Sequence, residues 1–228
     1  MNLLKDLRDL FAPNRCLHCK AIIPQNISFL CIDCHHQLEF TGFIGYANNP
    51  LEKLFLGKTD VIEAGSLYFY QKNSPIQTLL KALKYQGLET FGAYAAKAIS
   101  NELKTTTRFK NIDIVIPIPL HPKKEKSRGY NQVDEFAKII AKNLHADYIK
   151  DGLIKTENNK SQTKQNKEER HKSVQNSFKV NTNYLFNQKN VLLIDDVLTT
   201  GATLISCTKA LKKLNNVNIY IITIACVV

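Results

Sequence analysis

Residues 191–204 read VLLIDDVLTTGATL, and they carry more structural information than any other part of this 228-residue chain. The apolar, branched run 191–194 is typical of a buried strand in a parallel sheet. Two carboxylates, Asp195 and Asp196, follow at the expected carboxyl end of that strand. A helix is predicted from residue 202 to residue 214, so the segment forms a strand–loop–helix unit.

The loop between the strand and the helix has the composition of a phosphate site. It contains Val197, Leu198, Thr199, Thr200, Gly201, Ala202 and Thr203. A helix N-terminus offers unpaired backbone N–H groups to an anion, and threonine hydroxyls add further donors. Gly201 allows a close backbone approach or a positive φ. Asp195 and Asp196 can accept hydrogen bonds from ribose hydroxyls, or hold Mg²⁺ through water. The segment therefore predicts a seat for ribose 5-phosphate.

An ordinary crossover is the alternative interpretation of the same loop. Thr199, Thr200 or Thr203 could simply cap the following helix. Capping accounts for one threonine, however, and leaves two acids, two threonines and a glycine unexplained.

The stretch also resembles the motif with which type I phosphoribosyltransferases bind phosphoribosyl pyrophosphate (PRPP). The shared features are four apolar residues, two acids and a loop rich in threonine and glycine. The resemblance implies that Asp195 and Asp196 lie at the ribose hydroxyls of PRPP. It implies that residues 199–203 surround the 5′-phosphate.

The charge of the chain favours anionic ligands. Lys and Arg number 31 against 20 Asp and Glu, which gives a formal net charge of +11 and a pI near 9.3. Such a field favours nucleic acids, nucleotides or pyrophosphates. Residues 1–10 form a charged amphipathic pattern unlike a signal peptide, and the apolar run 219–228 is too short to span a bilayer. We therefore expect a cytoplasmic protein without membrane insertion.

Four of the six cysteines form two CxxC pairs that are separated by eleven residues. They are Cys16, Cys19, Cys31 and Cys34. In a reducing compartment this spacing indicates a tetrahedral four-thiolate Zn²⁺ site rather than disulfides. A closed site of this kind is structural, and it lets about forty residues fold with little core of their own. His18, His35 and His36 lie nearby, and we expect them to be exposed rather than ligating. Cys207 and Cys226 are expected to be packing residues.

Strand and helix patterns alternate along the rest of the chain. Strands are predicted at 61–70, 112–119, 147–154, 178–180, 191–194 and 219–228, and helices at 1–12, 74–86, 88–104, 131–144 and 202–214. Alternation predicts an α/β fold with a doubly wound, mainly parallel sheet and ligands at the carboxyl ends of the strands. We divide the chain into a helix and zinc module (1–40), a loop-like connector (41–60) and the main α/β domain (61–228).

Two further segments are expected near the phosphate loop. Residues 117–132, PIPLHPKKEKSRGYNQ, place Lys123, Lys124, Lys126 and Arg128 in a proline-rich loop. This composition suits a pyrophosphate, although a solvated basic turn with Asn131 as a helix cap is the alternative. Residues 155–173 contain no aliphatic residue and are expected to be a polar excursion. The excursion either folds over a ligand or is a plain surface loop.

The order of these features resembles the ComF/GntX family of phosphoribosyltransferase-like proteins along essentially the whole chain. The resemblance rests on the CxxC…CxxC module, IPIPLHPKKEKSRGYNQ, SQTKQNKEERHKSVQNSF and VLLIDDVLTTGATL. It implies a role in natural competence, with incoming single-stranded DNA and a helicase as partners, or else a role in uncharacterised metabolism. The positions that match the family pattern are Arg128, Gly129, Tyr130, Asn131, Gln132, Gln162 and Arg170. Ser173 stands where the family often has Asn.

Two classes of function remain open on the sequence, and a purely scaffolding role is a third possibility if neither kind of ligand binds. A pentosyl-transfer enzyme would use Lys124, Arg128 and Mg²⁺ to stabilise departing pyrophosphate while Asp195 and Asp196 hold the ribose. A non-catalytic single-stranded-DNA module would keep the phosphate loop and stack bases on aromatic side chains. Its candidates are Tyr68, Phe69, Tyr70 and Tyr85, which we expect to lie mostly in the core.

Overall fold

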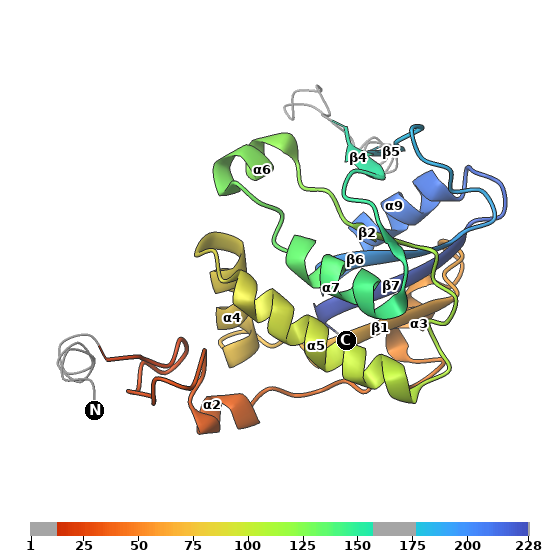
Figure 1. The fold of residues 1–228 in the computed structure, drawn as a ribbon. Coiled ribbons are helices and arrows are strands. Elements are labelled where there is room, and N and C mark those ends of the chain that lie inside the picture. Colours follow the sequence, from red (N-terminus) through yellow and green to blue (C-terminus); the bar gives the residue numbers. More distant parts are fainter. Residues whose placement is uncertain (1–12, 157–176, 228) are drawn as a thin grey trace, which may run out of the picture.

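The computed structural model describes residues 13–156 and 177–227. Its strands are β1 (Glu63–Phe69), β2 (Ile114–Pro117), β3 (Asp147–Tyr148), β4 (Leu153–Lys155), β5 (Phe178–Val180), β6 (Asn190–Leu198) and β7 (Asn218–Cys226). Five of them form one sheet in the order β1-β7-β6-β2-β3, and every neighbouring pair in it is parallel (Figure 1). Strands β4 and β5 form a separate antiparallel pair.

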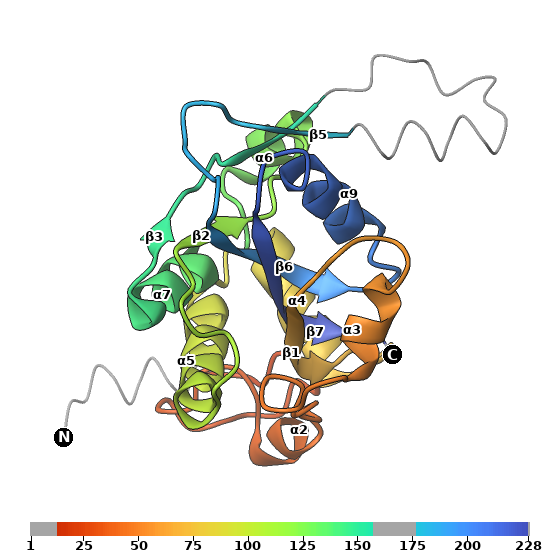
Figure 2. The same cartoon turned by 90° about the vertical axis from the view of Figure 1, so that its right-hand side faces the viewer.

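Helices cover both faces of the five-stranded sheet (Figure 2). In the described residues they are α2 (Ile32–His36), α3 (Pro50–Phe55), α4 (Pro75–Tyr85), α5 (Glu89–Thr105), α6 (Pro122–Arg128), α7 (Asp134–Leu144) and α9 (Ala202–Leu211). Buried side chains of α4, α5 and α7 pack on one face, and those of α3 and α9 pack on the other. The predicted doubly wound parallel sheet is therefore confirmed.

Local sequence signals explain where several helices begin. Ser74 accepts a hydrogen bond from the Gln77 backbone N–H, and Pro75 occupies the first turn of α4, as predicted. Asn49 is fully buried, and its side chain accepts from two backbone N–H groups of α3. The same side chain donates to the carbonyls of Phe43, Tyr46 and Ala64, so it fastens α3 to β1.

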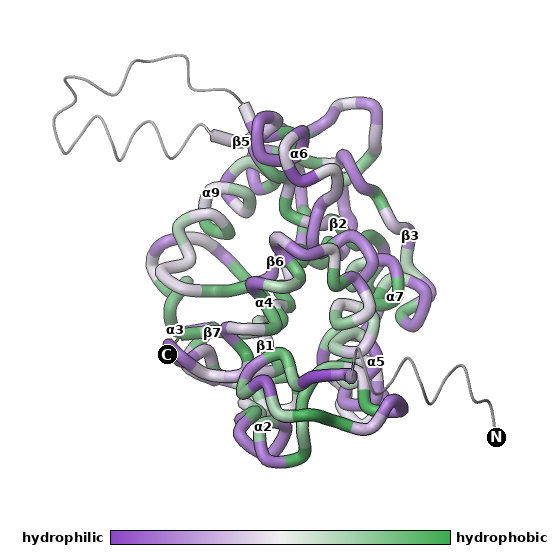
Figure 3. Tube along the Cα trace, turned by 90° about the vertical axis from the view of Figure 1, so that its left-hand side faces the viewer, coloured by the Kyte–Doolittle hydropathy of each residue, from purple (hydrophilic) through white to green (hydrophobic). Residues whose placement is uncertain are grey.

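Three expectations about local structure are wrong. The connector 41–60 is not a plain loop, because α3 forms within it and buries Leu51 and Phe55. The proline-rich loop contains α6, which begins at Pro122 and ends at Gly129 in the left-handed conformation (φ 81°). Proline at the first turn and glycine after the last favour a short helix there. Hydrophilic residues follow one another along α6, which has no buried residue (Figure 3).

The strand predicted at 147–154 is the third error. It is two short strands, β3 and β4, in different sheets. A turn at 149–152 separates them, and Gly152 is packed so closely that an added Cβ would lie 2.9 Å from the Ile116 Cδ1 atom. This close approach redirects the chain away from the parallel sheet.

The cysteine-bearing segment packs against the α4–α5 side of the molecule (Figure 1). Ile23, Leu30 and Leu38 belong to the same buried cluster as Leu83 and Phe91. The predicted helix 1–12 lies outside the described residues, as does all of the polar excursion except residues 155 and 156. None of the helices in the described ranges combines the length and the apolar character that a membrane span requires.

Candidate functional site

The paired acids lie inside β6, not after it. Hydrogen bonding to β7 continues to the pair Leu198↔Cys226, whereas pairing with β2 stops at Pro117↔Ile194. Asp195 and Asp196 therefore extend past the end of β2, where the sheet opens. Neighbouring residues of a strand project to opposite faces, so the two carboxylates leave the strand in different directions.

Asp196 is the better connected of the two acids. Its side chain is buried, and Lys84 Nζ of α4 lies 2.7 Å from its Oδ2 atom. Gln132 Nε2 donates to the same oxygen at 3.0 Å. The Oε1 atom of Gln132 in turn accepts a hydrogen bond from Arg128. One acid of the predicted motif is thus linked directly to the basic segment 117–132.

Asp195 lies on the face that α9 covers. It is half-buried and forms no ion pair with any described residue. Its Oδ1 atom accepts a hydrogen bond from the Asp196 backbone N–H at 2.9 Å. Burial, and then the neighbouring Asp196 carboxylate, raise the pKa of Asp195 to about 7, although Lys84 and Lys155 oppose the rise. Burial raises the pKa of the Cys207 thiol in α9, and the nearby Asp195 carboxylate raises it further.

A change of pH is expected to report on Asp195. Its pKa is about 7 in the folded chain against 3.8 for a free side chain, so the folded state binds more protons between these values. The free energy of unfolding therefore falls as the pH rises from about 4 to about 7. Asp195→Asn should remove this slope, and its melting temperature should exceed that of the wild type more at pH 8 than at pH 4.5. Thermal denaturation without metal or ligand measures this, and Asp60→Asn at an exposed position is the control. Equal slopes for all three proteins would contradict the assignment.

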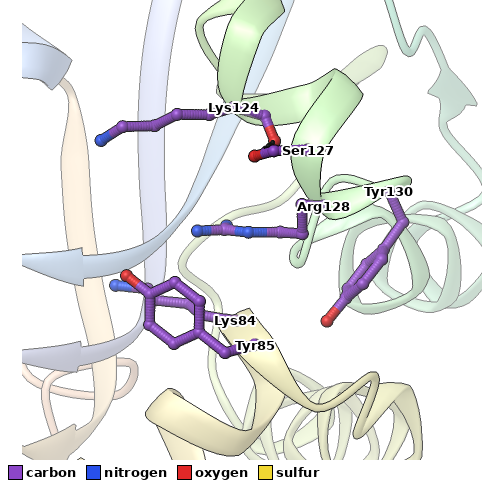
Figure 4. A pocket seen from close by; sticks show the side chains of 6 residues that line it. All are labelled: Lys84, Tyr85, Lys124, Ser127, Arg128 and Tyr130. Carbon is purple, nitrogen blue, oxygen red and sulfur yellow. Dashed lines mark hydrogen bonds between the residues drawn. The ribbon is translucent and has the colours of Figure 1, made fainter.

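A cavity of about 210 Å³ lies at Lys84, the ion-pair partner of Asp196. Its lining comes from the end of α4 and from the 117–132 segment, namely Lys84, Tyr85, Lys124, Ser127, Arg128 and Tyr130. Figure 4 shows the three cationic side chains extending in the same direction from two different helices. The cavity combines concentrated positive charge with a hydroxyl and two aromatic rings, which suits an anion such as a phosphate.

Arg128 and Tyr130 of the 117–132 segment contact the end of α4. The Arg128 guanidinium lies 5.2 Å from the centre of the Tyr85 ring, a cation–π contact. The Tyr130 hydroxyl donates to the Leu83 carbonyl and accepts from the Gly87 backbone N–H at 3.1 Å. These contacts bring a helix from early in the chain to the predicted pyrophosphate segment.

The phosphate loop turns at Gly201, which has φ 74° and is the N-cap residue of α9. This positive φ favours glycine, and an added Cβ would also meet the end of the Leu54 side chain. No side chain caps α9, which contradicts the alternative in which a threonine serves only as a helix cap. Thr199, Thr200 and Thr203 are all exposed and free to face a ligand.

The structure separates the predicted cations into two groups. Lys124 and Arg128 line the cavity, while Lys123 and Lys126 are exposed and lie outside its lining. Asn131 is buried and donates to the Ile118 carbonyl at 3.0 Å, and it does not cap α7. Gln162 and Arg170 lie outside the described residues.

Sequence reasoning missed Lys84, and it named Tyr85 only as a possible base-stacking residue and Gln132 only through the family resemblance. Lys84 and Tyr85 end an ordinary amphipathic helix, and no local signal distinguishes them. Tyr85 was also expected in the core, but it is 74% exposed, whereas Tyr68 is fully buried as expected. Gln132 ends the segment 117–132 that also carries the basic run, so its position was a usable hint.

The four cysteines of the two CxxC pairs come together. The Sγ atoms of Cys16, Cys19, Cys31 and Cys34 all lie within 4.8 Å of one another, and those of Cys19 and Cys31 are 3.6 Å apart. A tetrahedral site with Zn–S bonds of about 2.3 Å requires sulfur separations of roughly 3.8 Å. The cluster could therefore hold a metal ion such as zinc. Cys207 and Cys226 are buried packing residues, as predicted.

The nearby histidines do not join the cluster. His35 and His36 are exposed, as expected, and His35 Nε2 lies 2.9 Å from the Tyr94 hydroxyl. His18 differs from the expectation because it is half-buried, with Nδ1 2.9 Å from the Thr78 hydroxyl of α4.

Comparison with known proteins shows which family this chain is related to. Residues 135–228 match the phosphoribosyl transferase domain family. Competence protein F of Haemophilus influenzae is 24% identical over 210 residues, which cover 88% of this chain and 91% of that protein. Competence protein ComFC of Streptococcus pneumoniae is 30% identical over 193 residues, or 82% of each chain. The chain belongs to the ComF family.

This ComF-family protein has a type I phosphoribosyltransferase fold, with a parallel sheet between helices and a four-cysteine cluster ahead of it. Among solved structures, it is similar to adenine phosphoribosyltransferase from Leishmania tarentolae, with 12% identity and a TM-score of 0.39. That similarity covers 83% of this chain and 94% of the other.

Proposed function

We propose that this ComF-family protein binds PRPP, or a related ribose 5-phosphate ligand, together with Mg²⁺. The observation that carries the proposal is the position of Asp196. Its carboxylate lies at the open carboxyl side of the sheet, in contact with Lys84 and, through Gln132, with Arg128. A sugar-phosphate seat requires an acid for hydroxyl groups next to cations for phosphate. Exposed threonine hydroxyls at the start of α9 support the 5′-phosphate end of the site.

Each predicted residue has a role in this proposal. Residues 197–203 surround the 5′-phosphate, and Asp195 and Asp196 accept from the ribose hydroxyls. Lys124 and Arg128 bind the pyrophosphate. Because Asp195 and Asp196 leave β6 toward opposite faces, Asp196 serves the pyrophosphate side of the ligand and Asp195 the side of the phosphate loop. If the ligand reacts, the reaction is pentosyl transfer, with these groups stabilising pyrophosphate as it departs.

The proposed metals match the side chains available for them. Mg²⁺ prefers oxygen ligands, and the carboxylates of Asp195 and Asp196 supply them beside a cavity fit for pyrophosphate. In the cysteine cluster we propose structural Zn²⁺, since four thiolates close the coordination shell. Thiolates of this kind persist in a reducing environment, so we place the protein in the cytoplasm.

We also propose that the protein acts in DNA uptake during natural competence. Support comes from the names of its relatives, competence protein F and competence protein ComFC. Incoming single-stranded DNA and a helicase are the partners that this role implies. The division into a module at 1–40, a connector at 41–60 and a domain at 61–228 stays a prediction.

Replacing both acids is expected to abolish ligand binding. In Asp195→Asn, Asp196→Asn the charge is lost and the shape is kept, so the affinity for PRPP with Mg²⁺ should fall by about 100-fold or more, as expected for the loss of several charge-assisted bonds. Isothermal titration calorimetry with PRPP and Mg²⁺ measures this. Asp60→Asn, at an exposed position away from the cavity, should bind like the wild type. Unchanged affinity in the double variant would refute the proposed site.

A second function, direct binding of single-stranded DNA without catalysis, is favoured by one observation. The Tyr85 ring is exposed and borders the same cavity as three cations, an arrangement that can stack a base beside a backbone phosphate. Oligonucleotide titration over a salt series distinguishes the two functions. Steeply salt-dependent oligonucleotide binding in the absence of any PRPP binding would establish this second function instead.

A further inference from the structure

Lys84 occupies an unusual position for a helix-terminal lysine. Its Nζ atom lies 2.7 Å from Asp196 Oδ2, although the two residues belong to different layers of the fold. The Lys84 side chain is 27% exposed, and the Asp196 side chain is 8% exposed. The ammonium group therefore reaches from the solvent side to a buried carboxylate.

The contacts around this ion pair form a closed ring. Asp196 is bonded to Gln132, Gln132 to Arg128, and Arg128 lies over Tyr85, the residue next to Lys84. The Tyr130 hydroxyl also forms hydrogen bonds with the backbone of Leu83 and Gly87 at the end of α4. The ring fixes the backbone of Lys84 near Asp196 while its flexible side chain remains able to turn.

An ammonium group and a divalent cation compete for the same carboxylate, because each is attracted to its negative charge and they repel each other. At 2.7 Å the lysine takes the direction from which a metal or its bound water would approach, and it repels a second positive charge. Lys84 Nζ in this position therefore disfavours a metal at Asp196, and its departure would favour one. Lys84 also lines the cavity that we assign to pyrophosphate, so its ammonium group could bind a phosphate oxygen there instead.

We propose that Lys84 is an exchangeable counter-ion of Asp196. In the free protein it neutralises the carboxylate. When ligand arrives, Nζ moves to a phosphate oxygen and the divalent metal takes its place at Asp196. The exchange couples the two binding events, so metal alone binds weakly and metal with PRPP binds well. This inference rests on the proposed function.

Binding of Mn²⁺ alone tests the first half of the exchange. Electron paramagnetic resonance counts free Mn²⁺ over the full-length, zinc-loaded protein without PRPP. Lys84→Met should bind Mn²⁺ about tenfold more tightly than the wild type, a factor within the usual range of site coupling. Lys81→Met removes an exposed charge one turn earlier on α4 and should leave Mn²⁺ affinity unchanged. Equal Mn²⁺ affinity in Lys84→Met and the wild type, or no Mn²⁺ binding in either, overturns the inference.

Binding of PRPP tests the second half. With Mn²⁺ present, Lys84→Met should bind PRPP about tenfold more weakly, because the phosphate loses a cation. Lys84→Arg keeps the charge and should stay within a few-fold of the wild type, which excludes a folding defect as the cause. Loss of PRPP affinity without a gain in Mn²⁺ affinity contradicts the exchange while leaving the proposed function intact. Absence of PRPP binding in the wild type overturns the proposed function, whatever Mn²⁺ does.

Discussion

Arg108→Ala is expected to lower the free energy of unfolding by about 3–5 kcal/mol, the usual cost of leaving buried partner charges uncompensated. Arg108 is only 9% exposed. It forms ion pairs with Glu52 of α3 and with Glu63 of β1, the latter at 3.5 Å. Its Nη1 atom also donates to the backbone carbonyls of Phe43, Ile44 and Tyr46, at 2.8, 3.1 and 2.6 Å. Alanine leaves all of these groups without their cation.

The effect should reach the phosphate loop, since Arg108 holds α3 in place and Leu54 of α3 packs against Gly201. Chemical denaturation measures the stability, with Lys110→Ala at a neighbouring exposed position as the control. Arg108→Lys should restore only part of the loss, because an ammonium group cannot make the same fork of bonds. In a double-mutant cycle, Glu52→Gln should cost less in the Arg108→Ala background than in the wild type. A loss below 1 kcal/mol for Arg108→Ala would show that the cluster is not a structural clamp.

Cys34→Ser should have the other large effect, which is loss of bound metal together with loss of order in the cysteine segment. Structural zinc contributes on the order of 10 kcal/mol of apparent binding free energy in small modules at neutral pH. Cys34 is buried, and it is one of the four clustered cysteines among the described residues that could hold this zinc. The apolar side chains of the segment pack in one buried cluster with α4 and α5, so loss of the metal should also loosen that contact.

Metal content by mass spectrometry and hydrogen exchange along α4 and α5 measure the outcome. The wild type should carry one zinc per chain, and Cys34→Ser should carry much less and exchange faster along both helices. His36→Ala, at an exposed position beside the cluster, should keep its zinc. A chelator added to the wild type should reproduce the variant. Full zinc content in Cys34→Ser would rule out the four-thiolate site.

Patterns confined to a few neighbouring residues predicted much of the fold. The helix at 74–86 is confirmed because its signal, a capping serine followed by proline, acts locally. The strand at 61–70 is confirmed as β1. Local signals were also present for α3 and α6, where Asn49-Pro50 and His121-Pro122 begin helices. Those two were overlooked because short helices among polar residues lack apolar periodicity.

The predicted strand at 147–154 failed for a different reason. Asp151-Gly152 in its middle is a turn signal that the prediction passed over, and Gly152 also packs closely against Ile116 where the chain passes to the second sheet. Nothing in the local pattern shows that β2 lies there. Similarly, Tyr85 sits on an amphipathic helix and yet remains exposed, because α4 ends at the cavity rather than in the core.

The sequence by itself determined the parallel α/β architecture, the pairing of two CxxC motifs, and the place of two acids just ahead of the turn at Gly201. Each of these depends on residues close together in the chain, whose spacing fixes their chemistry. Only the tertiary structure decided that Asp195 and Asp196 face different sides of the sheet, and that Lys84, Gln132 and Arg128 gather around Asp196 alone. The register of β6 against β2 and the docking of α4 set those contacts, and both follow from packing between segments far apart in the sequence.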